Sequence, residues 1–140
     1  MTSKKNLLLD THIWLNYQGF TKALRRSAEQ AIDEAAERNA VYISVISIWE
    51  IAMLVRAARL ELNTSINHWA EVALSKPGIT LLPFSPLIAI ESVNLPDPMH
   101  KDPSDRILVA SARVEQMTLV TSDEKILNFA KTTGLPYLRG

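Results

Sequence analysis

Four carboxylates in this sequence lie where an apolar strand is expected to give way to a helix. They are Asp10, Glu50, Asp105 and Asp123. In an α/β sheet, ligands bind outside the carboxyl ends of the strands, so these four acids are expected to meet there. Acids brought that close together repel one another unless a cation lies among them or some of them hold protons. Mg²⁺ and Mn²⁺ prefer oxygen ligands, and the pattern therefore predicts metal-dependent phosphodiester chemistry.

Each of these acids also has a purely structural interpretation. Asp10 and Asp123 could each cap the helix that follows. Glu50 could complete a capping box with Ser47, which would require the helix to begin at Ser47. Glu50 is, however, the only charged residue between positions 38 and 56. A charge surrounded by so much apolar sequence needs a partner, and a metal ion would supply one.

The segment 102–105 offers two acids instead of one. Asp102 and Asp105 occupy the expected N-cap and third position of a helix, where the helix dipole favours negative charge. Capping accounts for one of the two acids. Asp105 is the predicted site residue because it begins a helical face that continues through positions 108 and 109.

Other polar residues near these acids allow two interpretations each. His12 and His100 could bind zinc or iron together with carboxylates, but a hydrogen-bonded or exposed side chain is favoured for both. Thr121 could offer its hydroxyl to a metal or to a bridging water. A basic cluster on the second predicted helix consists of Lys22, Arg25 and Arg26, and it is expected beside Arg56 and Arg59 on the third. It is either a solvated face or a contact for substrate phosphates.

The elements that must position these residues alternate between strand and helix. Apolar runs and turn residues predict strands at 6–9, 41–43, 79–84, 117–121 and, weakly, 136–138. Helical spacing and start signals predict helices at 11–16, 21–38, 44–58, 66–75, 85–92, 102–116 and 123–132. This alternation predicts an α/β fold in which helices cover both faces of a parallel sheet.

Length and composition are those of one globular domain spanning residues 1–140, with 47% apolar and 21% charged residues. Because the sequence contains no cysteine, disulfides and thiolate-bound zinc are excluded. The apolar stretch that ends at Asp10 is too short for a secretory signal, and no apolar run is long enough to span a membrane. A cytoplasmic protein without a membrane partner is therefore expected.

The overall charge gives little support to a dedicated nucleic-acid binder. Fifteen Lys and Arg residues balance fifteen Asp and Glu residues, whereas proteins that contact many phosphates usually carry a basic excess. This balance counts less against an enzyme, because an acidic metal site masks positive charge elsewhere.

Four segments in the same order resemble the PIN-domain family, with the greatest likeness to VapC-type toxins of bacterial toxin–antitoxin pairs. They are residues 8–12, 44–52, 100–110 and 119–123. The resemblance implies a three-layer α/β/α sandwich with a central, mainly parallel sheet, and a Mg²⁺- or Mn²⁺-dependent endoribonuclease. The four acids match the acidic positions of the family, and Thr121 matches a frequent hydroxyl position. His12 stands where many relatives carry asparagine, and residues 53–62 lack an expected Lys-Gly-Lys ending.

From these observations we predict in-line hydrolysis of an RNA phosphodiester by a metal-activated water. Catalysis is assigned to Asp10, Glu50, Asp105 and Asp123, and metal binding to Asp10, Asp105 and Asp123. Substrate binding is assigned to Thr121, Arg25 and Arg26. The predicted partners are an RNA substrate, a cognate antitoxin and a second copy of the chain. The apolar helix at 44–62 is a candidate surface for the two protein partners, although core packing explains it equally well.

Three other functions compete with this prediction. A phospho-acceptor domain would need an acid after the third strand, where the sequence has Phe84-Ser85-Pro86. An aspartyl phosphatase would need Asp-x-Asp after the first strand, where His12 occupies the third position. A PIN-fold protein that only binds partners, without nuclease activity, remains the main alternative.

Overall fold

A computed structural model describes residues 5–20 and 22–140, and a five-stranded sheet lies at its centre. The strands are β1 Leu7–Leu9, β2 Val41–Ser44, β3 Ile79–Leu82, β4 Thr118–Thr121 and β5 Tyr137–Arg139. Their spatial order is β3-β2-β1-β4-β5, and every pairing among these strands is parallel. Short, wholly apolar strands are typical of buried parallel sheets. The predicted parallel sheet is confirmed.

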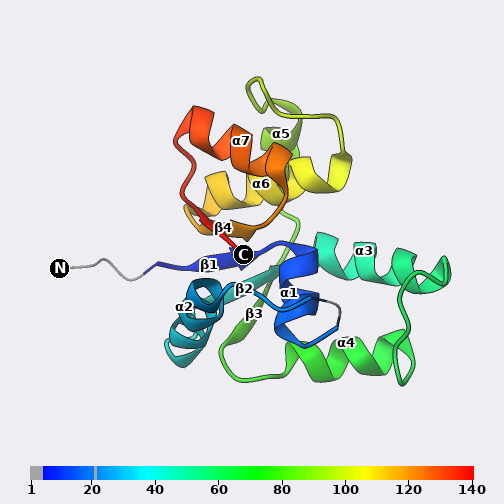
Figure 1. The fold of residues 1–140 in the computed structure, drawn as a ribbon. Helices are drawn as coiled ribbons and strands as arrows, with labels where there is room; N and C mark the ends of the chain where they lie inside the picture. Colours follow the sequence, from blue (N-terminus) through cyan, green and yellow to red (C-terminus); the bar gives the residue numbers. More distant parts are fainter. Residues whose placement is uncertain (1–4, 21) are drawn as a thin grey trace.

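Seven helices in the described ranges cover the two faces of this sheet. They are α1 Thr11–Tyr17, α2 Arg26–Glu37, α3 Val45–Arg56, α4 Ile66–Leu74, α5 Pro86–Val93, α6 Pro103–Glu115 and α7 Glu124–Thr133. Figure 1 shows α5, α6 and α7 above the sheet and α1, α2 and α4 below it. The predicted three-layer α/β/α sandwich is therefore confirmed.

The core is divided between the two faces by the alternation of side chains along each strand. Leu7 and Leu9 point to one face, where they pack in a buried cluster with Ile13 and Ile51 of α1 and α3. Leu8 points to the opposite face and belongs to a second cluster, which includes Ile88, Leu108 and Phe129 of α5, α6 and α7. Burying each such side chain contributes about 1.5–3 kcal/mol. Because both clusters contain leucines of β1, they hold the end of this strand, and the start of α1 after it, in place between the helical layers.

Most of the helices begin at a residue whose side-chain oxygen accepts a hydrogen bond from an amide of the first turn. These capping residues are Asp10, Ser44, Ser65, Ser85, Asp102 and Asp123, for α1, α3, α4, α5, α6 and α7 respectively. Each cap stabilises its helix by about 1 kcal/mol. Three of the six are aspartates of the segments that the sequence singles out, so capping and function overlap in this chain.

The second predicted helix begins later than expected. It was predicted at 21–38, but α2 begins at Arg26; Thr21 lies outside the described residues. Residues 22–25 are not helical, and the amide of Lys22 donates to Oδ1 of Asn16 at 3.2 Å. Leu24 packs, partly buried, against the core beneath this segment. The apolar spacing of residues 23 and 24 thus reflects a docked loop.

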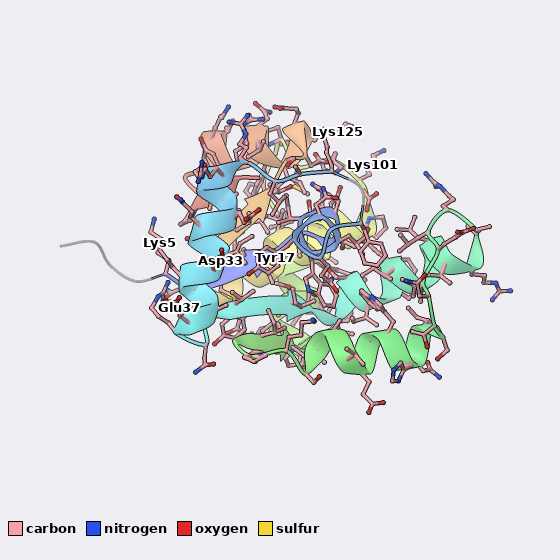
Figure 2. The ribbon with its side chains drawn as sticks, turned by 60° about the horizontal axis from the view of Figure 1, so that its bottom comes forward. Lys5, Tyr17, Asp33, Glu37, Lys101 and Lys125 are labelled. Carbon is pink, nitrogen blue, oxygen red and sulfur yellow. The ribbon has the colours of Figure 1, made fainter. Side chains whose placement is uncertain are left out.

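Side-chain contacts and backbone limits set the remaining boundaries. Tyr17 at the end of α1 donates a hydrogen bond to Asp33 of α2 at 2.5 Å, which links the two helices (Figure 2). Strand β3 lies at the sheet edge and ends before Pro83, because proline has no amide for the ladder. The last strand begins at Tyr137, one residue later than predicted. Across the described part of the chain, the helices are too short or too polar to cross a membrane.

Candidate active site

Asp10 lies at the centre of the candidate site. It follows the middle strand β1, caps α1 and is buried. Its Oδ1 accepts the amide of Thr11 at 2.7 Å, and its Oδ2 accepts the hydroxyl of Thr121 at 2.6 Å. Nδ1 of His12 lies 3.4 Å from the same Oδ2. These contacts hold the carboxylate at the carboxyl edge of the sheet, as the sequence predicted.

Burial raises the pKa of Asp10, and the negative charge of Glu50 raises it further. The proximity of His12 and the hydrogen bonds from Thr121 and the Thr11 amide act in the opposite direction. The net direction is upward, which means that the ionised form is unfavourable without additional positive charge. Asp10 is therefore a carboxylate that gains from a nearby cation.

Glu50 reaches the site from α3. The prediction that it lies at a junction between a strand and a helix is wrong. Helix α3 begins at Val45 and is capped by Ser44, so Glu50 lies in the second turn. The capping-box interpretation is therefore wrong, since it required the helix to begin at Ser47. Instead, the hydroxyl of Thr11 donates to Oε1 of Glu50 at 2.6 Å and lies 2.8 Å from the hydroxyl oxygen of Ser47.

The pKa of Glu50 is also raised. Burial is the largest cause, and the charges of Asp105 and Asp102 add to it, against the hydrogen bonds from Thr11 and Ser104. A carboxylate with a raised pKa accepts protons more readily near neutral pH. Glu50 thus has the properties of a group that can orient a water molecule and accept its proton.

The two acids near the start of α6 have different roles in the fold. Oδ1 of Asp102 accepts hydrogen bonds from the amides of Ser104 and Asp105 and from the Ser104 hydroxyl, at 3.0, 3.2 and 2.8 Å. Burial alone would raise the pKa of Asp102, but these hydrogen bonds outweigh it and lower the pKa. Asp102 is the helix cap.

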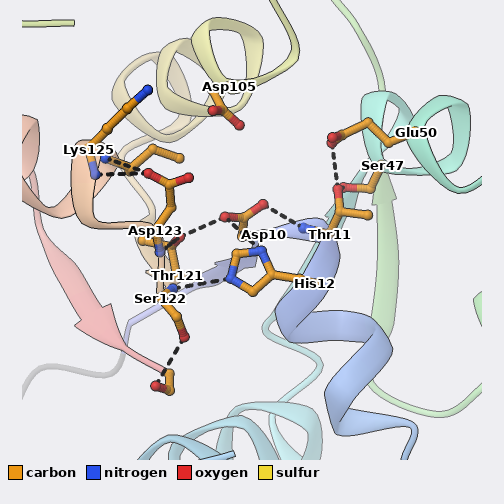
Figure 3. Close-up of polar contacts among 12 residues, drawn as sticks. Asp10, Thr11, His12, Ser47, Glu50, Asp105, Thr121, Ser122, Asp123 and Lys125 are labelled. Atoms are coloured by element: carbon orange, nitrogen blue, oxygen red, sulfur yellow. Dashed lines mark hydrogen bonds and ion pairs between the residues drawn. The ribbon is translucent and has the colours of Figure 1, made fainter. Parts of the chain in front are cut away.

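Asp105 does not cap the helix, and its side chain faces the other acids of the site (Figure 3). It is the third residue of α6 and follows a loop from α5, so the expected preceding strand is absent from this part of the described chain. Its Oδ2 lies 2.7 Å from Nε2 of His100. Burial raises the pKa of Asp105, the charges of Asp10, Asp102 and Asp123 raise it further, and His100 opposes them.

Asp123 approaches from the other side of Asp10. Its Oδ1 caps α7 by accepting the amides of Lys125 and Ile126 at 2.9 and 3.1 Å. Its own amide donates to the hydroxyl oxygen of Thr121 at 3.0 Å. Thr121 is fully buried at the end of β4, and its hydroxyl therefore connects Asp123 to Asp10. Figure 3 shows Asp10, Asp105 and Asp123 facing a common space, with Glu50 opposite them.

Both histidines near the site make hydrogen bonds or close polar contacts to their surroundings. Nε2 of His12 accepts the amide of Ser122 at 3.3 Å, which leaves its Nδ1 facing Asp10. His100 contacts Asp105, as described above. These contacts agree with the favoured interpretation of hydrogen-bonded side chains, and they place the two histidines on different acids.

The donor set of this site fits a hard divalent cation. All four predicted acids offer carboxylate oxygens, and the charges of Asp10, Asp105 and Glu50 act on one another strongly enough to shift their pKa values. Within residues 5–20 and 22–140, no three acidic or histidine side chains form a closed set of metal ligands as they stand. Mg²⁺ usually keeps several waters and takes only one or two protein carboxylates directly, so an open arrangement of this kind suits it.

The predicted basic cluster is divided by the late start of α2. Lys22 and Arg25 line a cavity of about 310 Å³ that also includes Ser122, next to the acids. Arg26 is the first residue of α2 and is exposed. The prediction that this cluster lies beside Arg56 is wrong, because the end of α3, which contains Arg56, lies on the opposite side of the molecule from α2 (Figure 1).

Two hydroxyls with structural roles in the site were missed by the sequence analysis. Thr11 holds Glu50, and Ser47 lies against Thr11. A partial signal was present for Ser47, which precedes Glu50 by three residues and therefore shares its helical face. The partner of Thr11 lies 39 residues away, and no local pattern indicates it.

Comparison with known proteins identifies the family. The family model described as the PIN domain matches residues 7–132, and the parallel sheet with its covering helices agrees with that match. The chain belongs to the PIN-domain family.

Individual proteins are similar to this chain in sequence or in fold. The chain is 28% identical over 120 residues to "Ribonuclease VapC22" of Mycobacterium tuberculosis (strain ATCC 25618 / H37Rv), covering 86% of this chain and 88% of the relative. Among solved structures, VapBC2 from Rickettsia felis bound to a promoter DNA fragment has a TM-score of 0.66 at 18% identity, covering 95% and 97% of the two chains. DNA-bound VapBC from Salmonella typhimurium has a TM-score of 0.67 at 15% identity, covering 96% and 98%. These two structures share the fold of this chain.

Proposed function

We propose that this protein is a metal-dependent endoribonuclease that acts as the toxin of a toxin–antitoxin pair. Membership of the PIN-domain family and the similarity to a VapC ribonuclease support this proposal. The observation that carries it is the meeting of carboxylates from four separate parts of the chain at the carboxyl edge of the sheet (Figure 3), where burial and neighbouring negative charges raise the pKa values of Asp10, Glu50 and Asp105.

Asp10, Asp105 and Asp123 would hold Mg²⁺ or Mn²⁺ in this proposal, directly or through water. The bound ion would lower the pKa of a water molecule and neutralise charge on the phosphate. Glu50, held by the Thr11 hydroxyl, would orient the attacking water and accept its proton. Thr11 and Thr121 fix Asp10 in place beforehand, which reduces the reorganisation that the reaction requires.

Substrate binding is proposed for Arg25, Arg26 and Thr121. Arg25 lines the cavity beside the acids and Arg26 is exposed next to it in the chain, so both are accessible to an RNA backbone. The burial of Thr121 and its hydrogen bond to Asp10 support an indirect contribution, through the position of that carboxylate.

The proposed function includes a cognate antitoxin, a homodimer and a cytoplasmic location. The toxin–antitoxin assemblies among the solved structures of the same fold support a protein partner. The exposed apolar side chains include Trp49 and Met53 on α3, Val72 on α4, and Leu87, Ile90 and Val93 on α5. The α5 residues are the most exposed, between 62% and 76%, and we assign this face to the second copy. Light scattering on Ile90→Asp against the unaltered protein tests this assignment.

The activity is tested by incubating the purified protein with total RNA and Mg²⁺ or Mn²⁺, with and without a chelator. We expect endonucleolytic cleavage that the chelator abolishes. Asp10→Asn should remove the cleavage and keep the fold, because the asparagine can still accept the Thr11 amide. Intact RNA under every metal condition would instead favour a PIN-fold protein that acts only by binding partners.

A further inference from the structure

A cavity of about 310 Å³ lies beside the carboxylates and is lined by three cationic side chains. Lys22 and Arg25 come from the segment that precedes α2, and Arg139 comes from the end of β5. The polar lining also includes Asn16, Ser122 from the turn after β4, and Glu124, the first residue of α7. The formal charge of the whole chain is zero, so a local excess of cations at this position needs an explanation.

The register of the sheet places this cavity next to the active site. Leu9 pairs with Val120, and Thr121 pairs with Arg139, so the ends of β1, β4 and β5 lie side by side at one edge. Neighbouring strands are separated by about 4.8 Å. Ser122 forms part of the cavity wall and directly precedes Asp123. The cavity therefore begins one residue before Asp123 in the chain.

The acidic side chain of Glu124 offsets part of the positive charge of the cavity. Glu124 accepts hydrogen bonds from Nη1 and Nη2 of Arg139, at 2.6 and 3.4 Å. Glu124 therefore occupies two donors of the guanidinium, a group that can bind phosphate oxygens with two parallel hydrogen bonds, and offsets part of its charge. The cationic side chains of the lining still outnumber the acidic ones.

We propose that this cavity binds a phosphate of the RNA backbone next to the phosphate that is cleaved. Arg139 would supply a directional contact, and Lys22 and Arg25 would supply positive charge. The proposal rests on the proposed nuclease function and adds to it a second backbone contact on the β5 side of the acids. Because only phosphate is contacted, the cavity would contribute affinity and register to binding without sequence preference.

The test measures binding of a fluorescent single-stranded RNA to Asp10→Asn protein in Mg²⁺, by anisotropy at several salt concentrations. On this background, Lys22→Gln/Arg25→Gln should weaken binding about tenfold and reduce the salt slope by about 0.7, the value for one phosphate contact on a single strand. Glu124→Gln should strengthen binding several-fold, because it removes the acid and releases Arg139. A purely structural role for these residues predicts no gain in affinity.

The matched control is Arg56→Gln/Arg59→Gln, which removes one exposed cation at the end of α3 and one in the turn after it, and should leave binding unchanged. Equal affinities for the two double variants, with matching thermal unfolding, would overturn the proposal. In the cleaving protein, Lys22→Gln/Arg25→Gln should raise KM and preserve kcat. If this variant cleaves with an unchanged KM, the cavity proposal fails while the nuclease proposal stands. If the unaltered protein does not cleave RNA, the nuclease proposal fails. The affinities of the two double variants then decide separately whether the cavity binds RNA.

Discussion

Replacing Thr11 by valine removes one hydroxyl and nearly preserves the shape of the side chain. In the folded protein this hydroxyl donates to Glu50 at 2.6 Å and lies 2.8 Å from the hydroxyl oxygen of Ser47. Thr11 and Ser47 are both buried. The substitution therefore leaves a partly buried carboxylate without one donor and a buried hydroxyl without its partner.

The expected loss of stability follows from these two consequences. A hydrogen bond to a charged group contributes about 1.5–3 kcal/mol, and a buried hydroxyl without a partner costs about 1–3 kcal/mol. Because Glu50 is only partly buried and can turn towards water, we expect Thr11→Val to lower the free energy of unfolding by about 2–4 kcal/mol in total. For a domain of this size, this corresponds to a decrease in Tm of about 6–12 °C.

The matched control is Thr11→Ser, which keeps the hydroxyl and removes only a buried methyl group, at a cost of about 0.8 kcal/mol. Urea denaturation of the two variants, followed by circular dichroism, measures the difference between them. Cleavage rates should follow the same order, because only serine still holds Glu50. If Thr11→Val is as stable and as active as Thr11→Ser, the assigned role of this hydroxyl is wrong.

Three further predictions concern charge, pH and backbone geometry. Burial, followed by the hydrogen bond and charge of Asp33, raises the pKa of Tyr17 from 10 to about 12. The stability from this contact is therefore present below pH 10 and lost as the pH rises through about 12. Urea denaturation at pH 9 and 11.5 should show a lower free energy of unfolding at the higher pH in the unaltered protein, and this loss should be absent in Tyr17→Phe. Because the pKa of Asp105 is raised, its contribution to stability is present below pH 3.8 and lost at higher pH. Calorimetry in chelator at pH 7 should therefore find Asp105→Asn more stable than the unaltered protein, and equal stabilities would contradict the crowding of acids. Gly78→Ala should lower the free energy of unfolding by about 1–3 kcal/mol in the same urea assay, since Gly78 has a φ of +85° and a new Cβ would lie 2.2 Å from the carbonyl oxygen of Ala36.

The central part of the fold could be predicted from local sequence, because several independent signals agree there. Three consecutive leucines form a strand buried on both faces, and the aspartate that follows can only emerge at the carboxyl edge of the sheet. The Ser85-Pro86 pair begins α5 as predicted, since the serine caps the helix and the proline fits its first position.

The remaining features depend on contacts between distant parts of the chain. The start of α2 was predicted several residues too early, because the docking of Leu24 on the core is not visible in a helical pattern. Glu50 was expected at a junction between a strand and a helix. Because α3 begins directly after its cap Ser44, Glu50 lies in the second turn of that helix. The position of Arg139 beside the acids depends on the pairing of β5 with β4, which joins residues 18 positions apart.

The most direct test of the nuclease proposal is the single-turnover rate of cleavage of one defined RNA across a Mg²⁺ titration, for the unaltered protein and for Asp10→Asn. The structure predicts a rate that rises with Mg²⁺ and saturates in the unaltered protein, and a loss of cleavage in a variant that remains folded. Cleavage by Asp10→Asn at the unaltered rate, or a rate that does not respond to Mg²⁺ and chelator, would contradict the claim that crowded carboxylates and a divalent ion perform the reaction.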